Sequence, residues 1–385
     1  MINNPLLYNN HHEIRERIRA FAEKEIAPLT AKLDEQEVFS VELTKKMGKE
    51  KLLGAFVPEK YGGHGMDYLS FIIAIEELAR VDSSQAATIS AHNALGIAPI
   101  LNWGTEEQKQ KFLPKLTTGE HLWAFGLTEQ NAGSDSRGTE TTAKLEGNEW
   151  VLNGEKMFIS NASSPITAGV TLQAITGINN EKKELSVILA EYPNPGITAK
   201  PMKGKMMWRA TDTSRLMIKN CHVPEENLLG ERGKGPKVML STLDSGRLTI
   251  AAIGLGLAQG AFEAALEYAG KRKQFGKKIS GFQSIAFKLA DMDMKIELAR
   301  NLLYKACWMK EKRLPFGKES AMAKLYASEI AQSIANETVQ IFGAHGLLKS
   351  SPVERFYRDQ RLLQIGEGTS EILRIVISRH LGCES

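Results

Sequence analysis

The chain has 385 residues, of which 42% are hydrophobic, and this is enough to bury a sizeable core in one to three domains. The net charge of +4 is mild, and Lys and Arg are interleaved with Asp and Glu, so nothing in the composition requires a nucleic-acid partner. The three cysteines are far apart, which argues against a disulfide framework and fits a reducing compartment.

Targeting and metal-binding signals are not found in the sequence. No apolar run approaches the length of a membrane span, and the polar segment 1–12 lacks the apolar centre of a signal peptide. His, Cys and Asp residues show no metal-ligand spacing, so we expect no metal site. We therefore expect a cytoplasmic protein, read as bacterial, that does not span a membrane.

The first region, residues 1–123, has the spacing of packed helices. Ile14, Ile18 and Phe21 recur at steps of four and three residues, which places them on one face of a helix. The apolar stretch 70–80 includes two adjacent acids and predicts a further helix. These patterns indicate an N-terminal α-helical domain.

The middle region, residues 124–232, is richer in Thr, Val and Gly and predicts a small β domain. Asn153-Gly154 separates two apolar runs, 150–152 and 156–159, and this dipeptide favours the positive φ angles of a tight turn. We therefore predict a β-hairpin centred on Asn153-Gly154. Further strands are expected at 185–190 and 214–218.

The third region, residues 233–385, returns to helical spacing. The glycines of segment 254–260 lack the spacing of a dinucleotide-binding loop and fall inside a helical pattern over 248–268. Close packing of two helices explains these small residues better. A near-heptad stripe predicts a long helix in a bundle: Ile285, Leu289, Met292, Ile296, Ala299 and Leu303.

A single acid, Glu367, lies between Gly366 and Gly368, just ahead of a predicted helix over 372–380. Glycines permit unusual backbone conformations and leave space around the acid, and the Thr-Ser pair that follows can cap the helix. From this segment alone two readings stay open. Glu367 is either a base held close to a substrate or a solvated acid in a turn.

A second segment, residues 127–135, is rich in Thr, Asn, Gly, Ser and Asp where the first two regions meet. Its hydroxyl and backbone N–H groups could hold a polar ring or a diphosphate. A solvent-exposed loop explains the same composition, and from these residues alone we favour it.

Together, five segments in chain order resemble the acyl-CoA dehydrogenase family over nearly the whole length of the chain. Segment 124–135 resembles the flavin loop of the family, and segment 152–161 resembles the strand that lies against the isoalloxazine ring. The remaining three are similar to the family's long-helix signature and to two C-terminal motifs: 272–276 with Gln283, 340–346 and 364–372.

The resemblance implies a mainly α fold with a middle β domain. Its parts would be an N-terminal α-helical domain (1–123), a small β-barrel or sandwich (124–232) and a C-terminal four-helix bundle (233–385). It also implies FAD, an acyl-CoA substrate of the short-, medium- or branched-chain type, and electrons passed to an electron-transfer flavoprotein. The expected assembly is a homotetramer, built as a dimer of dimers.

The resemblance assigns site residues by their match to family motifs. The residues implied to bind the flavin ring and the near side of FAD are Leu127, Thr128, Ser134, Phe158, Ile159 and Ser160. The residues implied to bind the FAD of a neighbouring subunit are Arg272, Gln274, Phe275, Gln283, Gln340 and Gly343. Further FAD contacts are implied for Ala344, Thr369 and Glu371. Substrate contacts are implied for Ser134, Asp244, Arg247, Gly366 and Gly368, although an ion pair with Asp244 also explains Arg247.

Glu367 matches the catalytic base of the family. It would take the proton α to the thioester carbonyl while hydride leaves the β carbon for flavin N5. Its backbone N–H and a ribityl hydroxyl of FAD would stabilise the enolate oxygen, and burial would raise the pKa of its carboxyl. Some relatives carry the base at the position of Gly246, which has no side chain.

Departures from the family pattern concern the cofactor and the substrate. Phe158 and Ser160 replace a common Trp and Thr but keep an aromatic face and a hydroxyl. Ala344 replaces a frequent Gly, and segment 206–209 replaces a Gly-x-Arg stretch. Gly366 replaces the Tyr of straight-chain enzymes, which predicts a wider pocket for branched or alicyclic acyl groups.

A flavin oxidase of the same fold and a non-catalytic scaffold are the alternative functions.

Overall fold

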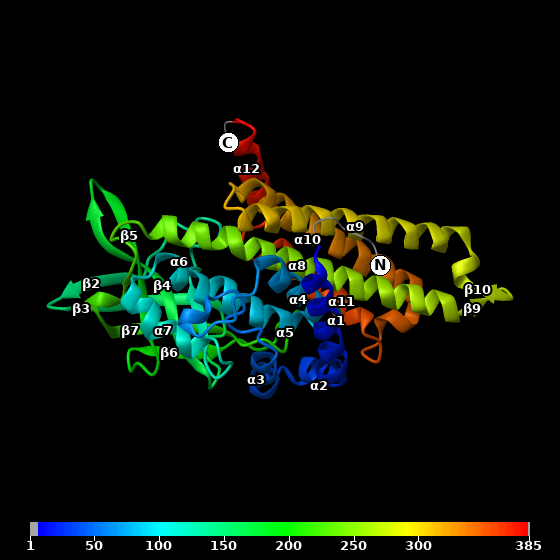
Figure 1. Cartoon of the computed structure of the whole chain (residues 1–385), viewed down its shortest axis with the longest axis horizontal. Coiled ribbons are helices and arrows are strands. Elements are labelled where there is room, and N and C mark those ends of the chain that lie inside the picture. Colours follow the sequence, from blue (N-terminus) through cyan, green and yellow to red (C-terminus); the bar gives the residue numbers. More distant parts are fainter. Residues whose placement is uncertain (1–6, 384–385) are drawn as a thin grey trace.

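The computed structural model describes residues 7–383. Figure 1 shows an elongated molecule in which the strands of the large sheet gather at one end and two long helices, α8 (Gly235–Lys271) and α9 (Gln283–Glu311), reach the other end. Residues 1–6, which carried part of the expectation about targeting, lie outside the described part of the chain.

Helices form the N-terminal region, as their spacing predicts. Ile14 and Ile18 are buried in the core. The side chains of Asp67 and Thr105 accept hydrogen bonds from backbone N–H groups and so begin α4 and α7. The helices are α1 (Asn9–Phe21), η1 (Ala22–Ile26), α2 (Ala27–Gln36), α3 (Val41–Lys49), η2 (Glu59–Tyr61), α4 (Tyr68–Val81), α5 (Ser83–Ser90), the π-helix η3 (Ala91–Ile97), α6 (Ala98–Trp103) and α7 (Glu106–Leu116).

The middle region is one sheet with strand order β6-β7-β3-β2-β4-β5-β8, and β1 joins it by pairing with β4. Most neighbouring strands are antiparallel, whereas β1 and β2 run parallel to β4. Its core includes Trp150, Leu152 and Leu172. The strands are β1 (Leu122–Gly126), β2 (Thr142–Glu146), β3 (Glu149–Ser160), β4 (Thr167–Asn179), β5 (Lys182–Glu191), β6 (Ile197–Pro201), β7 (Thr213–Pro224) and β8 (Leu228–Leu229), with a short η4 (Glu225–Asn227) before β8.

The predicted hairpin at Asn153-Gly154 is wrong, because β3 continues through both residues. Gly154 has a φ of 153°, and a Cβ there would lie 2.5 Å from the side-chain oxygen of Thr141. The register between β3 and β7 shifts at this point, so the glycine permits a bulge and a close approach rather than a turn. The hairpin turn lies earlier, where Gly147 has a φ of 64° between β2 and β3.

The C-terminal region is helical, and α10 packs against α8, α9 and α12. Five of the six residues in the predicted stripe on α9 are buried, and Ile285 packs at its edge. A two-stranded hairpin, β9 with β10, protrudes between α8 and α9 (Figure 1). The remaining elements are β9 (Lys273–Gln274), β10 (Lys277–Lys278), η5 (Ile279–Gly281), α10 (Gly317–Phe342), η6 (Gly343–Leu347), α11 (Val353–Asp359), η7 (Gln360–Gln364) and α12 (Ser370–His380).

The glycines of segment 254–260 serve helix packing, as predicted. A Cβ at Gly256 would lie 2.1 Å from the carbonyl oxygen of Glu76, and one at Gly260 would lie 2.1 Å from that of Arg80. These contacts press α8 against α4. The helix α8 is long and apolar enough to cross a membrane, but 78% of its most apolar window is buried inside the fold, which marks it as a core helix.

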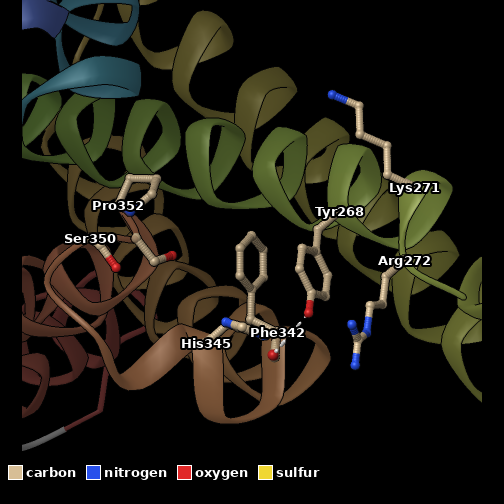
Figure 2. Close-up of a pocket in the computed structure, with 8 residues that line it drawn as sticks. Tyr268, Lys271, Arg272, Phe342, His345, Ser350 and Pro352 are labelled. Carbon is tan, nitrogen blue, oxygen red and sulfur yellow. Dashed lines mark hydrogen bonds between the residues drawn. The ribbon is translucent and has the colours of Figure 1, made fainter. Parts of the chain in front are cut away.

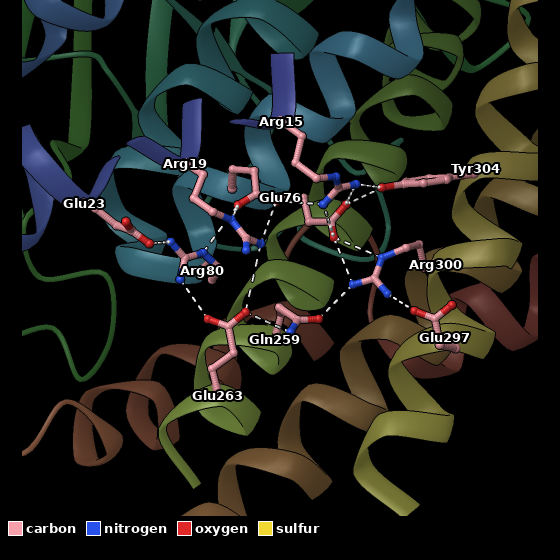
Figure 3. A network of polar contacts seen from close by, with 11 residues as sticks. Arg15, Arg19, Glu23, Glu76, Arg80, Gln259, Glu263, Glu297, Arg300 and Tyr304 are labelled. Carbon is pink, nitrogen blue, oxygen red and sulfur yellow. Dashed lines mark hydrogen bonds and ion pairs between the residues drawn. The ribbon is translucent and has the colours of Figure 1, made fainter. Parts of the chain in front are cut away.

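A polar network ties α1, α4 and α9 together beside these glycines (Figure 3). The buried carboxylate of Glu76 accepts hydrogen bonds from Arg15, from Arg300 at 3.1 Å and from the hydroxyl of Tyr304 at 2.6 Å. Burial alone would raise the pKa of Glu76, but Arg15 and Arg300 outweigh it and bring the pKa down to about 2. The charge inside the helical core is therefore compensated by two arginines.

The expected domain limits fall at different kinds of structure. The limit after residue 123 lies within β1, and the limit after residue 232 lies in the loop before α8. We keep both limits as a proposal about domain organisation.

Candidate active site

Glu367 lies in the turn between η7 and α12, and its backbone is left-handed with a φ of 55°. A non-glycine residue in this conformation is strained and needs support from its surroundings. Gly368 follows with a φ of 102°, which favours glycine. Thr369 then caps α12 by accepting a hydrogen bond from Ile372 N at 3.3 Å, and Glu371 is exposed in the first turn of that helix.

The carboxylate of Glu367 points at the backbone of α8. Its Oε2 is buried and has no hydrogen-bond partner in the described part of the chain. A Cβ at Gly246 would lie 2.0 Å from Oε2 and 3.0 Å from the side chain of Leu95 on η3. The missing side chain at Gly246 therefore makes the room that the Glu367 carboxylate occupies.

Burial raises the pKa of Glu367 to about 7, and the positive charges of Lys324 and Arg247 limit the rise. A carboxyl group with this pKa exchanges its proton near neutral pH, which suits a general base. The strain, the unpartnered oxygen and the raised pKa occur at one residue, a combination that marks functional sites.

Two cations hold the turn by its carbonyl groups. Arg247 donates to the carbonyl oxygen of Glu367 at 3.4 Å, and Lys324 on α10 donates to that of Gly368 at 2.6 Å. Arg247 also pairs with Asp244 at 2.7 Å, which is the structural role considered for it from sequence. The structure thus brings four of the predicted residues, Asp244, Arg247, Glu367 and Gly368, to one place.

The end of β3 presents alternate residues to solvent and core. Phe158 has a φ of 60° and is 62% exposed, whereas Ile159 is 2% exposed and packs in the core of the sheet. Only the backbone of Ile159 is therefore available to a cofactor. Ser160 is partly exposed, and Asn161 ties this strand to α5 by donating to Thr88 O at 3.0 Å.

The predicted flavin loop is fastened to the same strand. Met157 N donates to Thr128 O at 2.9 Å. Beneath the loop, the buried Lys156 ammonium contacts Glu129 at 2.6 Å and the carbonyl of Leu127 at 3.4 Å. Burial lowers the pKa of Lys156 to about 8 against the opposing effect of Glu129. This buried pair fixes the position of the loop relative to β3.

The loop and strand fit a flat, polar-edged cofactor such as FAD. Within the described part of the chain, the hydroxyls of Thr128, Ser134 and Ser160 make no hydrogen bonds and are free to bind the edge of a ring. A Cβ at Gly133 would meet nothing within 4 Å, so the loop has open space in front of it. Phe158, two residues before Ser160 on β3, offers an exposed aromatic face.

The remaining predicted cofactor residues lie at the other end of α8. Arg272 is 26 residues from Gly246 along this helix, which corresponds to about 40 Å at 1.5 Å per residue. Phe275 is 94% exposed. Also exposed are Arg272, Gln274, Gln283, Gln340, Gly343 and Ala344. One chain therefore divides its predicted cofactor residues between two distant places.

A hollow of about 470 Å³ lies at this distant end, and Figure 2 shows the residues that line it. Tyr268 stacks on Phe342 with ring centroids 4.1 Å apart, and Lys271, Arg272 and His345 also line the hollow. The structure thus places Arg272 and the segment around residue 343 at one hollow. Cations beside aromatic rings suit an anionic, ring-bearing ligand.

Comparisons with known proteins identify the family of the chain. Three family models match the chain: the N-terminal, middle and C-terminal domains of acyl-CoA dehydrogenase, over residues 9–120, 124–221 and 233–382. Probable acyl-CoA dehydrogenase YngJ of Bacillus subtilis (strain 168) is 47% identical over 369 residues, 96% of this chain and 97% of that protein. Mitochondrial short-chain specific acyl-CoA dehydrogenase of Mus musculus is 42% identical over 375 residues, 97% of this chain and 90% of that protein. The structure of butyryl-CoA dehydrogenase from Megasphaera elsdenii has a TM-score of 0.95 at 40% identity and covers 100% of both chains.

The chain therefore belongs to the acyl-CoA dehydrogenase family, and its fold is that of the family. It is an FAD-dependent oxidoreductase of fatty acid metabolism that dehydrogenates acyl-CoA thioesters. The family, the fold class, the cofactor and the enzyme class predicted from sequence are confirmed.

Three residues beside Glu367 were missed from sequence. Leu95 contacts the place where a Gly246 side chain would stand, and Tyr68 on α4 donates to the carbonyl of Ser245 at 2.9 Å. Lys324 carried a detectable signal, because it interrupts a stripe of small residues with steps of three and four on α10. That stripe is Ala321, Lys324, Ser328, Ala331 and Ala335.

Proposed function

We propose that Glu367 is the base that removes the α-proton of a short-chain acyl-CoA. The observation that carries this proposal is the buried, unpartnered Oε2 of a carboxyl group whose pKa is raised to about 7. A carboxylate held without a hydrogen-bond partner is a stronger base than one in water. FAD, when bound, accepts the hydride that leaves the β carbon.

The turn also offers a donor for the substrate carbonyl. The backbone N–H of Glu367 makes no hydrogen bond within the described residues, while its own carbonyl is held by Arg247. A free N–H beside the base can stabilise the negative charge that develops on the thioester oxygen as the α-proton leaves. Base and donor then come from one residue.

The cofactor proposal rests on the loop and strand that face open space. Thr128, Ser134 and Ser160 would bind the polar edge of the flavin, and Phe158 would lie against its face. The backbone, not the side chain, of Ile159 would contribute. Thr369 and Glu371 stay in the proposal as the first turn of α12, where backbone N–H groups favour an anion.

Glu367→Gln tests the assignment. We expect bound flavin and acyl-CoA binding to persist, while flavin reduction by butyryl-CoA under anaerobic stopped-flow conditions slows by about 10²-fold or more. In the wild type the rate should rise as pH increases through about 7, because the base must be ionised. Reduction of the variant at close to the wild-type rate would refute the role of Glu367.

The substrate proposal has two parts. The two short-chain relatives, from mouse and from Megasphaera elsdenii, support a preference for short acyl groups. Gly366 supports tolerance of branched or alicyclic groups, because a Cβ there would meet only Leu362, at ordinary contact distances of 3.7 Å and more. Flavin bleaching by linear, 2-methyl and cyclic acyl-CoA thioesters separates the two parts. If the enzyme turns over only linear acyl-CoA thioesters, the proposed tolerance of branched or alicyclic groups is wrong.

We also propose a homotetramer, built as a dimer of dimers, in which FAD is shared between copies. The support is the distance of about 40 Å along α8 between the Glu367 site and Arg272, which exceeds what one bound FAD would bridge. The exposed Phe275 and the hollow of Figure 2 would then serve a neighbouring copy. Light scattering of the flavin-loaded protein measures the copy number.

The electron acceptor and the location complete the proposal. An electron-transfer flavoprotein should reoxidise the reduced enzyme, and we expect little hydrogen peroxide under air. Rapid peroxide formation would instead indicate the oxidase alternative. A cytoplasmic location is supported by the three free cysteines, of which Cys221 and Cys307 are buried.

A further inference from the structure

Lys324 places a buried charge next to the Glu367 turn. Its side chain has no exposed surface, and its ammonium donates to the carbonyl oxygen of Gly368 at 2.6 Å. Burying an ammonium group is costly unless the surroundings compensate its charge. In the part of the chain that the structure describes, Lys324 makes no ion pair. A lysine with only a structural role does not need to be buried without an ion-pair partner.

Arg247 makes an instructive contrast because its charge is already matched. Its guanidinium pairs with Asp244 at 2.7 Å, so its effect on other groups is partly cancelled. Lys324 has no such partner, and among the charged groups that act on it Glu367 has the largest effect, ahead of Arg247 and Glu371. The charge of Lys324 is therefore left to act on the carboxylate of Glu367.

The groups that face Glu367 come from three elements. Lys324 on α10 and Arg247 on α8 are cationic, and both lower the pKa of Glu367 against the larger effect of burial. Tyr68 on α4 is neutral, because burial raises the pKa of its hydroxyl far above the usual range. Of these groups, Lys324 is the uncancelled positive charge.

We propose that Lys324 is a positioning residue for the dehydrogenation: it holds the Gly368 carbonyl and stabilises the ionised form of Glu367. The inference rests on the proposed role of Glu367 as the base. Together, Lys324 and Arg247 donate to two successive carbonyl groups, which keeps the strained turn in place. The same pair leaves the Glu367 N–H free for the thioester oxygen.

A pH profile tests the proposal, because a purely structural lysine would not move it. We measure anaerobic flavin reduction by butyryl-CoA in the wild type and in Lys324→Met across the neutral range. Loss of the nearby positive charge should move the midpoint of the acid limb upward by about one pH unit. The effect on the acid limb should disappear at higher pH, where Glu367 is ionised in both proteins, and any difference in rate that remains there reports the lost bond to the Gly368 carbonyl.

Two matched variants separate charge from support. Lys324→Arg keeps a positive charge and should hold the midpoint near the wild-type value. Ser328→Ala removes another bond from α10 to the same segment, the 2.9 Å bond to Leu363 O, without changing charge, so its midpoint should not move. Lys324→Gln supplies a second neutral side chain should the methionine variant lose its FAD. An unchanged midpoint in both neutral variants, with normal flavin content, would overturn the proposal.

A titration without turnover distinguishes this inference from the role of Glu367. Infrared difference spectra between wild type and Glu367→Gln follow the protonated carboxyl of Glu367 as pH changes. Its titration midpoint should rise in Lys324→Met whether or not Glu367 is the base. If Glu367→Gln does not slow reduction, only the role of Glu367 as the base is rejected. If the infrared midpoint does not move in Lys324→Met, the proposed effect of Lys324 on the ionisation of Glu367 is rejected.

Discussion

Gly246 offers a direct test of the geometry around Glu367. In Gly246→Ala the new Cβ would stand 2.0 Å from Glu367 Oε2, whereas ordinary contact begins at 3.4 Å. The carboxylate must therefore retreat by about 1.4 Å. Misplacement of a catalytic group by about 1 Å costs roughly 10²-fold in rate, so flavin reduction should slow by about that factor.

The fold should survive this substitution. The clashing atom is the end of a flexible side chain rather than backbone, and alanine is favoured over glycine in a helix by up to about 1 kcal/mol. We expect the melting temperature and the flavin content of Gly246→Ala to stay close to those of the wild type. Stopped-flow flavin reduction and thermal unfolding measure the two effects separately.

Gly270→Ala is the matched control on the same helix. A Cβ at Gly270 meets nothing within 4 Å, so this variant shares the change in helix propensity without the clash. Its reduction rate should equal that of the wild type. If Gly246→Ala reduces flavin as fast as Gly270→Ala, the close approach of Glu367 to α8 does not hold the base for catalysis.

Two further predictions concern buried charges. Arg15 and Arg300 lower the pKa of Glu76 to about 2, so the stability that its ionised form contributes should be lost as pH falls below about 4.5. At neutral pH, Glu76→Ala should lower the free energy of unfolding by about 3 kcal/mol or more, measured by chemical denaturation. Lys156→Met leaves Glu129 buried without its cation, so the flavin loop should loosen and less FAD should stay bound after gel filtration, measured by flavin absorbance.

Surface pairs provide the controls for both predictions. Glu267→Ala removes the exposed partner of Lys271 and should leave the unfolding midpoint unchanged. Lys144→Met breaks the exposed pair with Glu146 and should retain FAD fully. An equal loss in the buried and exposed variants of either pair would contradict the reasoning from burial.

The helices were predictable because their patterns extend over many residues. The α9 stripe and the glycines of α8 each predicted a packed face, and the structure confirms both. The Asn153-Gly154 hairpin failed because a glycine has two uses in a strand. Its glycine is needed because Thr141, just before β2, approaches it closely, and this contact leaves no local trace in the sequence.

The site was predictable only through its motifs. Glycines on both sides of Glu367 indicated an unusual turn, which the structure describes, but they could not indicate what the carboxylate faces. Gly246 and Lys324 lie 121 and 43 residues away from Glu367 in the chain, and the packing of α8 and α10 brings all three together. Tertiary contacts of this kind are invisible to local patterns.

The length of α8 has a genetic consequence under the proposed sharing of FAD. A fault at Glu367 would silence the copy that carries it, whereas a fault at Arg272 would silence a healthy neighbour. Alleles that affect the two ends of one helix would therefore differ in dominance. A substitution at Arg272 would inactivate neighbouring subunits made from an intact gene, whereas a substitution at Glu367 would inactivate only the subunit that carries it.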